Sequence, residues 1–289
     1  MSSLSCRSVR LSAALLVLAG VLWGTGGLAG ALLQSATGIG PVAVAAYRLL
    51  VGGGVAVLFT ASRLRELRTS AAFRRLLVTG GLLAAFQAAY QVAVAWIGVS
   101  LSTLITIGSV PMFVAGVDGL LARRTPGWRT LLAIGGALVG LALLTGGAGP
   151  TARMPQGVAM SLLAGAGFAL LTLLAARPVA GQQATTSAGL LLGGILLTPF
   201  GLLAGGMGLP LDACVLAFVL YLGLVPTAIA YGAYFLGLRH AQPTAAALAT
   251  MLEPLTATLL AVGLYGERLT PSGIAGALLI VGALALHYL

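Results

Sequence analysis

Residues 11–33 read LSAALLVLAGVLWGTGGLAGALL, a stretch that carries no charged residue. A helix needs about 20 mostly apolar residues to cross a hydrocarbon core about 30 Å thick, because lipid offers the backbone no hydrogen-bond partner. Arg7 and Arg10 precede the stretch, as they would in a secretory signal peptide. The apolar run is too long for such a peptide, and similar runs recur along the chain. The stretch therefore predicts a retained transmembrane helix.

The rest of the chain has the same character. Of its 289 residues, 59% are hydrophobic and only 7% are charged, and the mean hydropathy is +1.08. Soluble domains carry about 25% charged residues, so a water-soluble fold is excluded. We predict an all-α membrane protein with ten transmembrane helices. The predicted segments are residues 11–33, 42–61, 76–97, 102–122, 129–147, 157–176, 186–206, 213–236, 245–265 and 271–288.

The basic residues indicate the orientation. All 15 are Arg, against 5 acidic residues, and they fall between the apolar segments. A nucleic-acid surface would gather them on one face with interleaved aromatic residues, so we expect no nucleic-acid partner. With a cytoplasmic N-terminus only Arg153 and Arg268 lie outside and Arg48 lies within a span, which satisfies the positive-inside rule. We expect a multi-pass protein of the bacterial inner (plasma) membrane with both termini in the cytoplasm.

The two halves of the chain resemble each other. Residues 19–23 (AGVLW) align with 164–168 (AGAGF), and residues 89–98 (AYQVAVAWIG) align with 230–239 (AYGAYFLGLR). Val110-Pro111 likewise corresponds to Glu253-Pro254. Five spans in each half would turn the second copy upside down, so we predict two inverted repeats, residues 1–148 and 149–289. Such repeats, with helices interrupted by Pro and Gly, are typical of secondary transporters whose substrate binds near the membrane midplane.

The chain resembles the EamA family of the drug/metabolite transporter superfamily. The likeness covers essentially the whole chain and is carried by Trp23-Gly24, Glu253-Pro254 and the turn Gly266-Glu267-Arg268-Leu269-Thr270. The first half departs from the family pattern, with Leu121-Ala122-Arg123 where the family usually has Gly-Glu-Arg. The resemblance implies a transporter that exports small metabolites, amino acids included.

Three ionisable residues fall inside spans: Arg48, Asp118 and Glu253. Burial of a charge at the bilayer centre costs about 2.5–3.5 kcal/mol on insertion scales, so each is a candidate functional residue. Glu253 precedes Pro254, whose missing N–H frees a backbone carbonyl, and a carboxylate there would meet an ammonium group or a proton. Structural roles stay open: Arg48 would snorkel or bond helix ends, Asp118 would face cytoplasmic water, and Glu253 would bond a neighbouring helix.

Aromatic and amide side chains form a second group of candidates. Tyr90 and Tyr231 are repeat mates, as are Trp23 and Phe168, and such residues at mid-depth offer flat walls and hydrogen bonds to an amphipathic solute. For Tyr234, a role in helix packing or in the interfacial aromatic belt stays open as an alternative. The predicted substrate-binding residues are Trp23, Tyr90, Gln91, Tyr231, Tyr234 and Glu253, with Arg48, Gln87 and Asp118 as further polar residues inside the membrane.

Other classes of function fit the residues less well. The only histidines, His240 and His287, and the five acidic residues lie at no catalytic or metal-binding spacing, so we expect no enzyme, metal or cofactor. A channel would repeat like groups by rotational symmetry. A carrier of phosphorylated or nucleotide sugars would need clustered basic residues, whereas Arg48 stands alone. A membrane protein that binds partners without transport stays open.

We therefore predict a secondary transporter that works by alternating access. It would export amino acids with aromatic or neutral side chains, act as a monomer in the lipid bilayer, and line its path with spans one, three, four, six, eight and nine.

Overall fold

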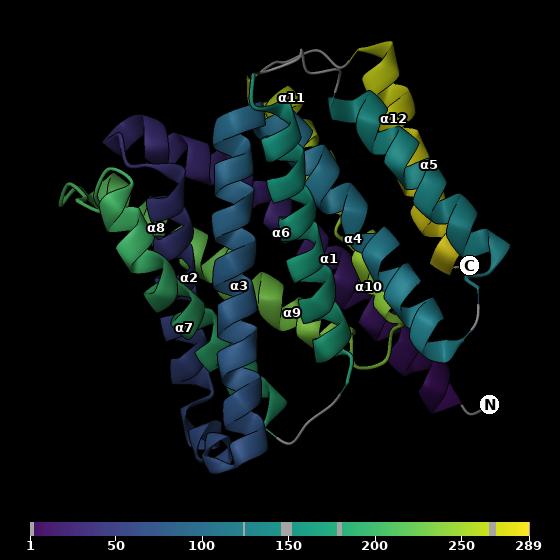
Figure 1. The fold of residues 1–289 in the computed structure, drawn as a ribbon, viewed down its shortest axis with the longest axis horizontal. Coiled ribbons are helices and arrows are strands. Elements are labelled where there is room, and N and C mark those ends of the chain that lie inside the picture. Colours follow the sequence, from purple (N-terminus) through teal and green to yellow (C-terminus); the bar gives the residue numbers. More distant parts are fainter. Residues whose placement is uncertain (1–2, 124, 146–151, 178–180, 266–269, 289) are drawn as a thin grey trace.

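The computed structural model describes residues 3–123, 125–145, 152–177, 181–265 and 270–288. These residues form helices joined by short connections and include no strand, which confirms the all-α prediction (Figure 1). The elements are α1 (Ser3–Thr37), α2 (Pro41–Phe59), the 3-10 helix η1 (Ala61–Arg68), α3 (Ser70–Ile97), α4 (Val99–Ala122), α5 (Trp128–Thr145), α6 (Met154–Ala175), α7 (Gln182–Leu203), α8 (Ala213–Gly223), the π-helix η2 (Leu224–Ile229), α9 (Ala230–Gly237), α10 (Pro243–Ala249), α11 (Leu252–Tyr265) and α12 (Pro271–Tyr288).

Helices occupy every predicted apolar segment. Within the described part of the chain, 8 helical stretches are long and apolar enough to cross a membrane, and α5 and α12 are shorter apolar helices. The protein is thus a multi-span membrane protein. Arg124, residues 266–269 of the Gly-Glu-Arg turn and the predicted repeat boundary at 148/149 lie outside the described residues.

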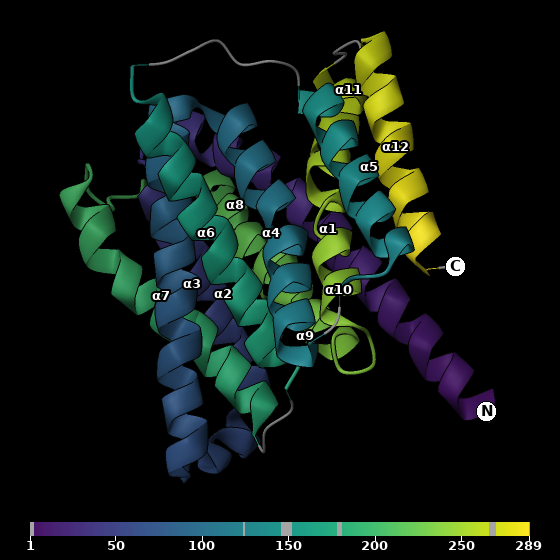
Figure 2. The same ribbon diagram turned by 45° about the vertical axis from the view of Figure 1, so that its right-hand side comes forward.

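Helix α1 is longer than its predicted segment. It has 35 residues, which at 1.5 Å per residue corresponds to about 52 Å. A hydrocarbon core is about 30 Å thick, so a helix of this length must tilt or extend into the polar interface. Figure 2 shows α1 crossing the bundle obliquely, with its N-terminal end projecting beyond the neighbouring helices.

The predicted eighth span is divided into three pieces, contrary to the single helix expected. Pro226 lies within η2 and has no N–H to donate to Leu222, four residues earlier. The Leu222 carbonyl instead accepts a hydrogen bond from the Thr227 hydroxyl at 2.7 Å. The extra residue per turn of a π-helix thus accommodates the proline without unpairing that carbonyl.

The predicted ninth span is also interrupted. Helix α10 ends at Ala249 and α11 begins at Leu252, so the break lies just ahead of Glu253. Its cause is Pro254, whose ring conflicts with the carbonyl of Thr250 four residues earlier. The amide of Glu253 reaches that carbonyl instead, at 3.0 Å. Pro111, the aligned proline of the first half, lies within the continuous helix α4.

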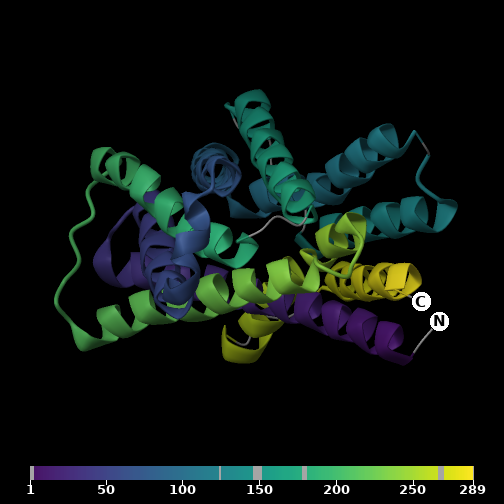
Figure 3. The same ribbon diagram turned by 90° about the horizontal axis from the view of Figure 1, so that it is seen from below.

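The helices surround a central core, beside which α5 and α12 form a pair (Figures 2 and 3). In the core, α2 packs on α7, α3 on α6 and α7, α4 on α6, and α1 on α9 and α11. Glycines allow some of these helices to approach closely: a Cβ at Gly20 would lie 2.4 Å from the Ala249 carbonyl oxygen, and one at Gly140 would lie 2.7 Å from that of Gly276. Gly136 makes only an ordinary contact. The close approach of α1 to the α10–α11 break places the middle of α1 beside Glu253.

Candidate functional site

The central core encloses a cavity of about 60 Å³. Pockets that hold small-molecule ligands measure about 300–1,000 Å³, so this one holds a few water molecules and must widen to admit a solute. Its walls come from the six spans expected to line the path and, in addition, from α2. The lining residues are Trp23, Arg48, Phe86, Gln87, Tyr90, Thr106, Ile107, Val110, Phe168, Tyr231, Thr250 and Glu253.

Aromatic rings form one wall of this central cavity. The Trp23 ring meets Phe168 at 5.8 Å between centroids and Tyr231 at 5.2 Å, both edge to face. Phe86 extends the wall from α3 and lies 5.2 Å from Phe168. Such edge-to-face contacts fix the ring orientations, so the wall is rigid and offers ring faces to a bound solute.

The two repeat-mate tyrosines both line the cavity. The Tyr90 hydroxyl shares a hydrogen bond of 2.7 Å with the Thr103 hydroxyl of the adjoining helix α4. The Tyr231 side chain lines the cavity together with that of Gln87, which α3 contributes. The two halves of the chain thus meet at the cavity.

Opposite charges face the cavity from α2 and α11. Arg48 and Glu253 both line it and are close enough to attract each other electrostatically. The Arg48 Nε–H and the Trp23 indole Nε1–H are buried and have no hydrogen-bond partner among the described residues. A buried donor left unpaired costs about 1–3 kcal/mol, so a ligand that accepts from these two groups would recover that cost.

Three predicted site residues lie away from the cavity. Tyr234 is fully buried behind the aromatic wall, where its hydroxyl shares a hydrogen bond of 2.8 Å with Thr172. Gln91 follows Tyr90 directly and is therefore rotated by about 100° around the helix, away from the lining face. Asp118 is exposed near the end of α4. Tyr234 supports the wall, and the other two have no part in it.

Five of the lining residues were not among the candidates predicted from the sequence: Phe86, Thr106, Ile107, Val110 and Thr250. Phe86 lies four residues before Tyr90, and Thr250 lies three residues before Glu253. Residues three or four apart share one helix face, so this spacing from the residues already identified was the available signal.

Comparison with known proteins agrees with this fold. The EamA-like transporter family matches the chain twice, over residues 10–146 and 155–289. A solved crystal structure superposes with a TM-score of 0.82 over 96% of both chains, at 19% sequence identity, which shows a shared fold.

Two relatives carry transporter names. "Uncharacterized transporter YwfM" of Bacillus subtilis (strain 168) is 34% identical over 275 residues, covering 93% of this chain and 91% of that protein. An "Uncharacterized transporter" of Archaeoglobus fulgidus is 29% identical over 199 residues, or 68% of this chain and 70% of that protein. The family match spans the whole chain. The chain is therefore a member of the EamA-like transporter family, and hence of the drug/metabolite transporter superfamily, and it is a membrane transporter and not an enzyme.

Proposed function

We propose that this transporter exports small zwitterionic solutes, chiefly amino acids with neutral or aromatic side chains. The observation that carries the proposal is the placement of Arg48 and Glu253, two groups of opposite charge, in the lining of one aromatic-walled cavity. An amino acid presents a carboxylate to the unpaired donors of Arg48 and Trp23 and an ammonium group to Glu253. Its side chain then lies against the ring faces of the wall.

The lining argues against phosphorylated solutes. Arg48 is the only basic residue among those that line the cavity, and a phosphate carrying two negative charges would face Glu253 as well. Recognition of phosphate normally uses several donors from clustered Arg or Lys. A single positive and a single negative group match a zwitterion better.

We propose that transport proceeds by alternating access between two inverted repeats. Two findings support this: the family matches each half separately, and the helix contacts recur between the halves. Helix α6 packs on α3 and α4, and α1, its counterpart by alignment, packs on α9 and α11. Inverted copies can exchange conformations, so that the site opens first to one face of the membrane and then to the other.

The arginines support an orientation with both termini in the cytoplasm of a bacterial cell. Helix η1, which carries Arg63, Arg65 and Arg68, lies at the end of the bundle that also holds the N-terminal end of α1 (Figure 1). Positive charges accumulate on the cytoplasmic side of plasma-membrane proteins. We propose that the monomer is the transport unit.

The test is counterflow in liposomes that contain the purified protein and a neutral or aromatic amino acid. We expect saturable uptake of the labelled amino acid from outside. Unlabelled phenylalanine should compete for uptake, whereas its analogues without the carboxylate or without the amine should compete at least about tenfold more weakly, since each loses one charged contact. Equal competition by both analogues, or no saturable uptake of any amino acid, would contradict the proposal.

Arg48→Gln is expected to weaken the apparent affinity for phenylalanine by about 10- to 100-fold. The change removes charge-assisted hydrogen bonds to the carboxylate, each of which contributes about 1.5–3 kcal/mol. The matched control is the analogue that lacks the carboxylate: its weak competition should be the same in Arg48→Gln and in the unmodified protein. If the variant weakens both compounds equally, Arg48 does not bind the carboxylate and only supports the fold.

A further inference from the structure

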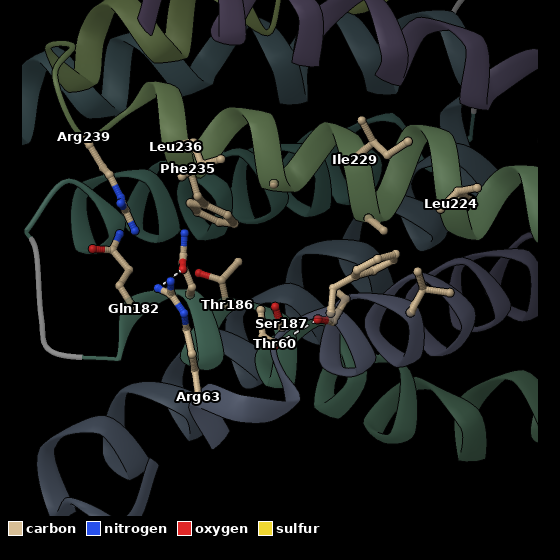
Figure 4. Close-up of a pocket in the computed structure, with 16 residues that line it drawn as sticks. Thr60, Arg63, Gln182, Thr186, Ser187, Leu224, Ile229, Phe235, Leu236 and Arg239 are labelled. Carbon is tan, nitrogen blue, oxygen red and sulfur yellow. Dashed lines mark hydrogen bonds between the residues drawn. The ribbon is translucent and has the colours of Figure 1, made fainter. Parts of the chain in front are cut away.

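A second cavity lies outside the central site, between α2, α7 and the α8–η2–α9 segment. Its volume is about 370 Å³, and it opens at the arginine-rich end of the bundle (Figure 4). Phe235 belongs to its wall and lies 6.0 Å from Tyr231, which lines the central cavity. We call this second cavity the crevice; one layer of aromatic rings separates it from the proposed substrate site.

The mouth of the crevice is polar and basic. Arg63 and Arg239 point toward each other from opposite walls, with Gln182 beside them (Figure 4). Arg63 donates a hydrogen bond to the Gln183 side chain, and both arginines are exposed, so most of their N–H groups stay available. Two other titratable residues, Glu66 and His240, line the same mouth. The mouth therefore carries a net positive charge.

The inner part of the crevice is apolar and open to its surroundings. Leu224 and Ile229 lie at the end opposite the arginines (Figure 4), and Ile229 has 45% of its surface exposed. Phe59, on the facing wall, is 83% exposed. Leu224 and Arg239 are 15 residue steps apart, which corresponds to about 22 Å along a helix, more than the roughly 15 Å depth of one leaflet. The crevice thus extends from the membrane surface toward the midplane and is accessible from the lipid.

We propose that the crevice binds an anionic phospholipid, with its phosphate held by Arg63 and Arg239 and one acyl chain lying along α9 toward Leu224. Basic pockets between transmembrane helices on the cytoplasmic side are suited to anionic head groups, because that leaflet is negatively charged. The crevice has a polar mouth, an apolar interior and an opening toward the lipid. These three features together match a phospholipid and do not match a fully soluble ion. The bound chain braces Phe235 and, through it, the Tyr231 wall of the substrate site.

The test measures lipid binding directly, on the full-length protein after removal of co-purified lipid. Native mass spectrometry in detergent would follow the titration with phosphatidylglycerol and with phosphatidylcholine of identical chains. We expect phosphatidylglycerol to bind at least tenfold more tightly. The double variant Arg63→Gln/Arg239→Gln should bind about 25-fold more weakly, the product of about fivefold for each arginine. Arg65→Gln/Arg68→Gln is the matched control in the same segment and should bind as the unmodified protein does.

A second variant tests the apolar part of the crevice. Gly232 lines it, and a Cβ at this position would have no atom within 4 Å, so Gly232→Leu fills the crevice without disturbing the packing. This variant should abolish the tight phosphatidylglycerol binding, whereas Gly116→Leu on α4 should not. A Cβ at Gly116 would likewise have no atom within 4 Å, and Gly116 does not line the crevice.

Three outcomes would overturn the lipid site. These are equal binding of the two lipids, unchanged binding by both the double arginine variant and Gly232→Leu, and displacement of phosphatidylglycerol by soluble glycerol phosphate at comparable concentration. The last would identify a site for free phosphate. None of these measurements uses transport. A failure of the lipid-site proposal can therefore be distinguished from a failure of the proposed amino-acid export.

Discussion

We expect Glu253→Gln to lower the rate of amino-acid transport by about 10- to 100-fold. Glutamine keeps the size and the hydrogen-bonding atoms of the side chain but removes the charge that faces Arg48 and the solute ammonium group across the cavity. The position is sensitive because Glu253 follows the Thr250–Met251 break directly, where the backbone is already irregular. Initial rates of counterflow and of net uptake in liposomes would measure the effect.

The two assays separate the two roles open to this carboxylate. If Glu253 binds the ammonium group, both counterflow and net uptake fall. If it carries a proton, uptake driven by a pH gradient is lost while exchange of solute for solute persists. Asp118→Asn is the control, since Asp118 is exposed on α4 and removal of its charge should change neither assay. Unchanged rates for Glu253→Gln in both assays would remove Glu253 from the site.

Gly24→Ala is expected to lower both the thermal stability and the transport rate severely. A Cβ at Gly24 would lie 2.5 Å from the Thr256 Cβ and 2.6 Å from the Glu253 carbonyl oxygen. Because one of these neighbours is backbone, α1 and α11 must separate, and overpacking of this kind costs about 1–3 kcal/mol. The separation would also displace Trp23 and Glu253 from each other. We expect a melting temperature lower by several degrees and transport reduced more than tenfold.

Gly27→Ala provides a closely matched control. It lies one turn further along the same helix, and a Cβ there would have no atom within 4 Å. Both substitutions gain the same helix propensity, about 1 kcal/mol, so the difference between them isolates the contact with α11. Thermal melting of the two purified variants, together with counterflow in liposomes, would measure this difference. Equal stability of the two variants would mean that α1 and α11 are not packed as the structure has them.

Much of the architecture was accessible from the sequence because the membrane constrains it strongly. A span must be apolar for about 20 residues, so segments such as 11–33 stand out, and the arginines mark the connections between them. Glu253 and Arg48 were identifiable because charges within such segments are rare. Trp23, Tyr90 and Tyr231 were identifiable because the alignment of the halves pairs the tyrosines with each other and Trp23 with an aromatic residue.

Rotation about the helix axis was not accessible in the same way. Depth in the membrane follows from residue number, but the direction of a side chain depends on which neighbours surround the helix. Tyr234 was therefore assigned to the substrate although it faces Thr172, and Gln91 was assigned beside Tyr90 although it faces elsewhere. Thr106 and Thr250 escaped notice because threonine is common in apolar helices, where its hydroxyl bonds the helix's own backbone, as Thr250 does with Ala247.

The irregular segments also could not be derived from the presence of proline alone. Pro111 and Pro199 lie within continuous helices, whereas Pro226 produces a π-helix and Pro254 a break. The outcome depends on which donor can hydrogen-bond to the carbonyl that the proline leaves unpaired. The Thr227 hydroxyl donates to the Leu222 carbonyl, and the Glu253 amide donates to the Thr250 carbonyl.

The helix break beside Glu253 has no counterpart at Pro111, so the two halves differ in backbone structure at equivalent positions. Two copies of one unit that are joined in a single chain can come to differ in flexibility as well as in sequence. In the first half, helix α4 is continuous through Pro111, whereas the corresponding helix of the second half is broken between α10 and α11. We therefore expect the second half, whose helix is broken next to Glu253, to be the more flexible of the two.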